Sequence, residues 1–172
     1  MAVHTKAQAT QAIRGGVLAG VVGGVVLSAF TLAVTLANGM NGWAPIKAPG
    51  APMLGERALQ PGFDATAIGV GVISHFATSI VWGVLFGLLF FGLTRLGTVL
   101  AGATWSVVVW IAMRYAVLPG LGLAELGAGM PLEIEVFGHL LFGVSAAAAF
   151  LPFQRALPRI GLRPPHWRPT SY

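Results

Sequence analysis

The sequence predicts an all-α integral membrane protein, a bundle of four transmembrane helices with both chain ends on the cytoplasmic side. Hydrophobic residues make up 56% of the 172 residues and charged residues only 9%, whereas a soluble domain carries about a quarter charged residues to cover its surface. The mean hydropathy of +0.80 agrees with this composition. The chain has no cysteine, which excludes disulfides, thiolate metal sites and cysteine nucleophiles.

The basic residues are placed as in a membrane protein. The pI is about 10.8, a value that nucleic-acid-binding proteins share. Here, however, Lys6 and Arg14 precede the first apolar run, and arginines follow the last one at positions 155, 159, 163 and 168. Basic ends on an apolar chain are typical of membrane topology and of contact with anionic lipid headgroups. We therefore expect the lipid bilayer as partner and no nucleic acid.

The first helix is predicted over residues 15–37, after a cytoplasmic tail of residues 1–14. This run has no charge and exceeds the roughly 20 residues that cross a bilayer. It is also longer than the apolar part of a signal peptide, about 7–15 residues, so we expect it to be retained. The outer loop 38–65 contains four prolines and predicts extended or turn structure, with a possible short interfacial helix over Met53–Leu59.

Three further helices complete the predicted transmembrane domain, residues 15–152. The second covers residues 66–94, with His75 as its only ionisable residue. The third covers 96–118 and ends before Pro119, and the fourth covers 132–151. A basic cytoplasmic tail of residues 153–172 follows.

Lysine and arginine counts predict the orientation, because cytoplasmic segments carry the excess of basic residues. With the amino end inside, the outer segments hold only Lys47 and Arg57. The inner segments hold seven: Lys6, Arg14, Arg95, Arg155, Arg159, Arg163 and Arg168.

Small residues four apart predict the packing faces, because membrane helices associate where their backbones approach closely. The predicted packing glycines are Gly16, Gly20, Gly24, Gly83, Gly87, Gly102 and Gly143. Ser28 continues the stripe of the first helix, and Trp110 with Arg114 continues that of the third. The same spacing can drive self-association, so we expect a homo-oligomer or a partner in a membrane complex.

A polar cluster is predicted inside the bundle near its outer face. Its members lie at similar depth on three helices: His75, Ser79, Arg114, Glu135 and His139. Charged groups at membrane depth are costly and need partners, and Glu135 is the expected partner of Arg114.

Three interpretations of this cluster remain open. The groups can be purely structural, in a protein that is an accessory subunit of a larger membrane complex. They can handle protons, ions or a small solute, because histidine changes charge near neutral pH. They can also bind a cofactor, either b-type haem between His75 and His139 or a transition metal at these histidines and Glu135. No arrangement typical of an enzyme is found, so we expect no catalysis and, in the leading interpretation, no cofactor.

Three short motifs resemble those of the YagU-like inner-membrane proteins. They are Ser74–Trp82 (SHFATSIVW), Leu100–Ala103 (LAGA) and Glu135–Leu140 (EVFGHL), in the same order as in that family. The resemblance covers roughly residues 66–145. It implies a small four-helix protein of the bacterial inner membrane, and it singles out His75, Glu135 and His139.

Overall fold

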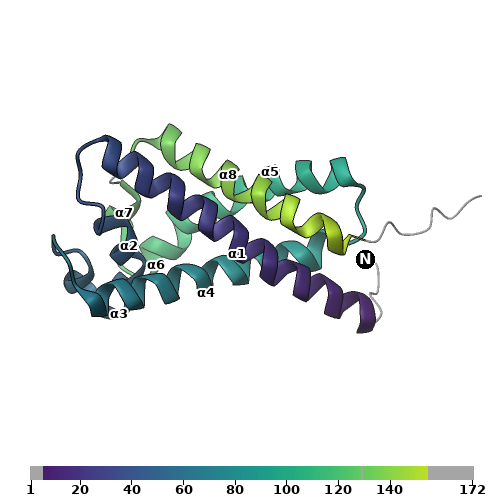
Figure 1. Ribbon diagram of the computed structural model, residues 1–172, viewed down its shortest axis with the longest axis horizontal. Helices are drawn as coiled ribbons and strands as arrows, with labels where there is room; N and C mark the ends of the chain where they lie inside the picture. The colour runs from purple at the N-terminus through teal and green to yellow at the C-terminus, as the bar shows by residue number, and fades with distance from the viewer. Residues whose placement is uncertain (1–5, 129, 155–172) are drawn as a thin grey trace, which may run out of the picture.

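The computed structural model describes residues 6–128 and 130–154 and contains only helices and turns in these ranges (Figure 1). Four stretches of the described chain are long and apolar enough to cross a membrane. They contain the long helices α1 (Lys6–Ala37), α4 (Ala65–Phe90), α5 (Arg95–Ala112) and α8 (Leu132–Phe150). The predicted all-α class with four long apolar helices that could cross a membrane is therefore confirmed. Of the two predicted tails, residues 1–5 and 155–172 lie outside the described residues.

Local chemistry explains most helix ends. Asp64 and Thr94 act as N-caps, since their side chains accept hydrogen bonds from the first turns of α4 and α5. α4 ends at Phe90 rather than at the predicted residue 94, because the next residue is extended and Gly92 has φ 93°. α1 begins at Lys6 instead of residue 15, since helical structure extends into the polar residues before the apolar run.

The third membrane-crossing stretch is not a uniform α-helix. α5 passes into the π-helical turn η3 (Met113–Val117) and then into the short α6 (Leu118–Gly120). A π-helical turn within a helix is rare and occurs frequently at functional sites. Arg114, one of the predicted cluster residues, lies in this turn.

The loop 38–65, for which the sequence predicts extended or turn structure, forms mainly short helical turns, and it is helical over most of the predicted Met53–Leu59 segment. The loop contains four short helical segments, α2 (Ala44–Lys47), η1 (Ala48–Gly50), α3 (Ala51–Leu54) and η2 (Gly55–Ala58). Three of its prolines stand in the first turns of these segments, where a missing N–H costs nothing.

This loop folds back onto α4 as a cap. A Cβ on Gly71 of α4 would collide with the backbone of Ile46 and Lys47. Lys47 was predicted to be a basic residue of an outer segment, but it is only 1% exposed. Its ammonium group donates to the carbonyl oxygens of Gln60 and Gly62, which satisfies the buried charge with backbone acceptors.

The four long helices pack in the order α4, α1, α8, α5, with extensive contacts between successive members. α4 and α5 contact each other little, although only a short turn joins them. The predicted packing glycines, Gly16, Gly20, Gly24, Gly83, Gly87, Gly102 and Gly143, all lie at helix crossings, where a Cβ would come within 3.0 Å of a neighbouring atom. These small-residue faces are therefore occupied within the chain.

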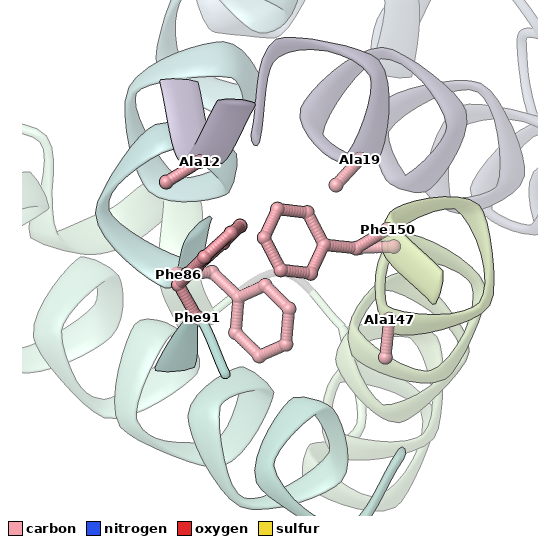
Figure 2. Close-up of a cluster of buried hydrophobic side chains, with 7 residues drawn as sticks. Ala12, Ala19, Phe86, Phe91, Ala147 and Phe150 are labelled. Carbon is pink, nitrogen blue, oxygen red and sulfur yellow. The ribbon is translucent and has the colours of Figure 1, made fainter. Parts of the chain in front are cut away.

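One end of the bundle has a dense aromatic core (Figure 2). Phe86, Phe91 and Phe150 pack between the helices with small residues such as Ala12 and Ala147. The end of the described chain closes this core, because the side chain of Gln154 donates to the Phe90 carbonyl and accepts from the Gly92 N–H. The cap and α7 (Ala124–Ala128) lie at the opposite end of the bundle (Figure 1).

Candidate functional site

A cavity of about 690 Å³ lies between the helices in the half of the bundle away from the aromatic core. All four long helices contribute to its wall, together with the cap and the connection between α6 and α8. Most lining side chains are apolar, but His75, Arg114, Glu135 and His139 also line it. These four are the only ionisable residues among its described lining.

The centre of the polar wall is an ion pair between η3 and the first turn of α8. Nη1 of Arg114 lies 2.5 Å from Oε2 of Glu135. The same carboxylate oxygen accepts a hydrogen bond of 3.2 Å from Nε1 of Trp110. The Arg114 and Glu135 side chains are only 23% and 14% exposed, so each charge depends strongly on the other.

The imidazole of His139 is oriented by its own helix. Its Nδ1 lies 2.8 Å from the carbonyl oxygen of Glu135, four residues earlier. Because a carbonyl oxygen can only accept, Nδ1 carries the proton. In the neutral ring, Nε2 is then a hydrogen-bond acceptor, on a side chain that lines the cavity.

The imidazole of His75 is oriented by α1. Its Nε2 lies 3.0 Å from the carbonyl oxygen of Gly24 and 2.9 Å from Oγ of Ser28. Nε2 therefore carries the proton, and Nδ1 is the acceptor of the neutral ring. Ser79, one turn along α4, is buried and also lines the cavity.

The structure thus brings all five predicted cluster residues, His75, Ser79, Arg114, Glu135 and His139, to one cavity. Arg114 pairs with Glu135, while His75 contacts α1 rather than the other members. Sequence reasoning missed Ser28 and Trp110 as their partners. Their spacing could have identified them. Each lies on a small-residue stripe, and Trp110 precedes Arg114 by one helical turn.

The arrangement bears on the predicted metal ligands. Among the described residues, no three His, Cys, Asp or Glu side chains form a group that could hold a metal ion. His75, Glu135 and His139 are therefore not gathered as a three-ligand set. For haem, each histidine would have to offer an unprotonated nitrogen, and the one on His75 would be Nδ1, since Nε2 faces Gly24 and Ser28.

The site is a mostly apolar cavity whose wall includes a balanced ion pair and two oriented imidazoles. Hydrogen bonds to named partners hold its four ionisable side chains, His75, Arg114, Glu135 and His139. The chain matches no model of a protein family, no curated protein and no solved structure.

Proposed function

We propose that this protein is a multi-pass membrane protein that binds a small molecule in the cavity between its helices. The observation that carries the proposal is the contrast between the two halves of the bundle. One half is filled by aromatic side chains, while the other contains a cavity of about 690 Å³ that four ionisable groups help to line. Ligand pockets typically have about 300–1,000 Å³, apolar walls and a few convergent polar groups.

The proposed role is binding and not catalysis. The polar groups of the cavity are held by each other or by backbone carbonyls, as expected for groups that fix the orientation of a ligand. Handling of a small solute, one of the three interpretations of the sequence, is the one that this cavity supports best.

We place the protein in the bacterial inner membrane with both ends cytoplasmic. The support is the excess of basic residues in the predicted inner segments, and the resemblance of three motifs to the YagU-like family. Self-association also belongs to the proposal, although the small-residue faces that suggested it are used within the chain. A mass measurement in detergent solution tests it, and a strict monomer would contradict it.

The proposal is tested by filling the cavity and measuring what the protein retains. Met113 lines the cavity, so Met113→Trp should occupy ligand space. Ile111, two residues earlier, is 47% exposed and does not line it, so Ile111→Trp is the matched control. Native mass spectrometry of protein from its own membranes should show a bound small molecule in the wild type and in Ile111→Trp, and its loss in Met113→Trp. Equal occupancy in both variants, or an empty wild type, would contradict the proposal.

Haem is the second candidate, because both predicted ligand histidines line the same cavity. An absorption spectrum of protein expressed with added haem precursor tests it. A Soret band that disappears in the His75→Ala/His139→Ala variant would support this candidate, whereas a colourless protein would exclude it.

A further inference from the structure

Resting on the proposed function, we propose that the ligand is a neutral, lipid-like molecule with a hydroxyl group, and that it enters the cavity sideways from the bilayer between α4 and η3. Three features of the described residues lead to this assignment. They are the charge balance of the cavity, the direction of its hydrogen bonds and the position of its opening.

The charge balance favours a neutral ligand. Arg114 and Glu135 neutralise each other at 2.5 Å, and the remaining ionisable lining residues are the two histidines. A charged ligand would bring a further charge into an apolar cavity without a partner, which is costly.

The hydrogen-bond directions favour a donor on the ligand. Both imidazoles donate their proton to a backbone carbonyl, His75 to Gly24 and His139 to Glu135. Each neutral ring therefore has an acceptor nitrogen left over, Nδ1 of His75 and Nε2 of His139. A hydroxyl group satisfies such an acceptor, whereas an ester or a hydrocarbon cannot.

The remaining wall suits a hydrocarbon chain. Large aliphatic and aromatic side chains from α1, α5, η3 and α8 line it, including Leu27, Phe30, Val109, Val117 and Phe142. Such a wall gives a hydrocarbon chain apolar contacts similar to those that it has in the bilayer. The cavity is thus apolar along most of its wall and polar in one region.

A second pocket points to an opening on the side of the bundle. A smaller pocket of about 290 Å³ between α4 and η3 shares Thr78, Trp82, Met113 and Val117 with the wall of the main cavity. It is completed by Ala77 and Val81, of which Val81 is 57% exposed on the outer surface of α4. α4 and α5 contact each other little, so no helix packing closes this seam.

The end of the cavity, in contrast, is lined by the cap and by the connection between α6 and α8. The lining residues there are Pro45, Pro49 and Pro52 of the cap and Leu121 and Leu123 of the connection between α6 and α8. The buried Lys47 ties the cap to the carbonyl groups of Gln60 and Gly62. A molecule dissolved in the bilayer meets the side opening first, which agrees with a lipid-like ligand.

The ligand class is tested with three probes that share one chain length: dodecan-1-ol, methyl dodecanoate and dodecanoate. Binding to the protein in lipid nanodiscs is measured as the ligand-dependent rise in Tm. Dodecan-1-ol should bind roughly tenfold more tightly than the other two, the ratio expected for one buried hydrogen bond. Replacing both acceptors, His75→Phe and His139→Phe together, should remove this preference, whereas Ile111→Trp, which lies outside the cavity lining, should keep it.

The outcomes separate this inference from the proposed function. If none of the probes binds the wild type, and Met113→Trp retains the same small molecules as the wild type, the cavity is no ligand site and both proposals fail. If methyl dodecanoate or dodecanoate binds as well as dodecan-1-ol, the cavity remains a ligand site but the assignment of a neutral hydroxyl ligand is overturned.

The side opening is tested with a single thiol, because the chain contains no cysteine. A bulky maleimide on Val81→Cys should slow the association of 12-bromododecan-1-ol at least tenfold, measured by quenching of the tryptophans that line the cavity. The same label on Ile73→Cys is the control, since Ile73 is 71% exposed on α4 and lines neither pocket. An unchanged association rate in labelled Val81→Cys would overturn entry through this seam.

Discussion

At the scale of single residues, the Arg114–Glu135 pair is the most sensitive feature of the site. Removing one partner of a largely buried pair leaves the other charge uncompensated. We expect Glu135→Gln to lower the free energy of unfolding by roughly 2 kcal/mol, since both side chains keep some exposure. Glu133→Gln, an exposed change in the same turn of α8, should cost less than about 0.5 kcal/mol.

Thermal unfolding in detergent measures both variants. The double variant Arg114→Met/Glu135→Gln should recover part of the loss, because it removes the uncompensated charge. Arg114→Met alone is measured as well. If the double variant loses as much stability as Arg114→Met and Glu135→Gln lose together, the two charges are not coupled.

Asp64 gives the protein a defined response to acid. Two hydrogen bonds from Arg57 and one from the backbone N–H of Ala67 hold its carboxylate. Chiefly through Arg57, they lower the pKa of Asp64 to about 2. A lowered pKa in the folded state stabilises the protein above the ordinary value of 3.8, and this contribution disappears as the pH falls toward 2.

The variant Asp64→Asn isolates this contribution, because asparagine also caps a helix but does not titrate. At pH 6 the variant should be less stable than the wild type, and the difference should shrink between pH 4 and pH 2. Unfolding midpoints measured across this range check the prediction. A difference that stays constant down to pH 2 would contradict it.

At the scale of helices, the crossing of α1 and α4 depends on backbone contact. A Cβ at Gly83 would lie within 3.0 Å of backbone atoms of Gly16 and Gly20. Backbone cannot move aside as a side chain can, so Gly83→Ala should destabilise the protein by about 1–3 kcal/mol.

Gly69 provides the matched control on the same helix. A Cβ there would meet nothing within 4 Å, and alanine is the better helix former by up to about 1 kcal/mol. Gly69→Ala should therefore leave the melting temperature unchanged or raise it. Equal losses in both variants would show that the close approach at the crossing does not cause the loss.

The sequence predicted those helices and crossings that depend on residues within a single helix. The four long helices follow from uncharged apolar runs, and their crossings follow from the four-residue spacing of glycines. In the cap the sequence predicted a short helix only over Met53–Leu59, because Pro45 and its neighbours indicate either a turn or the first turn of a helix. Burial of Lys47 was missed because its carbonyl partners come from residues far along the loop.

At the scale of the whole molecule, the cavity could not be predicted. The polar residues of the site were found from their depth and helix face, but a void depends on how side chains from all four helices fill the space between them. Phe86 and Phe150 fill it at one end. Leu27, Phe30 and Phe142 line the cavity at the other end, and nothing in their spacing along the sequence indicates that they leave this space unfilled.

The orientation of the molecule in the membrane is the remaining prediction at this scale. The start of α1, the turn between α4 and α5 and the end of α8 lie at one end of the bundle, opposite the cap (Figure 1). The basic residues predict that the cap faces outward. Single cysteines can test this in intact cells, since the natural chain has none.

Gln60 in the cap and Leu93 in the α4–α5 turn are both exposed and suit this test. A membrane-impermeant maleimide should label Gln60→Cys in intact cells, and Leu93→Cys only after the membrane is permeabilised. The reverse pattern would invert the orientation and place the capped end of the cavity on the cytoplasmic side. Labelling of both residues in intact cells would mean that they lie on the same side, so that α4 does not cross the bilayer. In that case the lipid-facing opening between α4 and η3 would lose its physical basis.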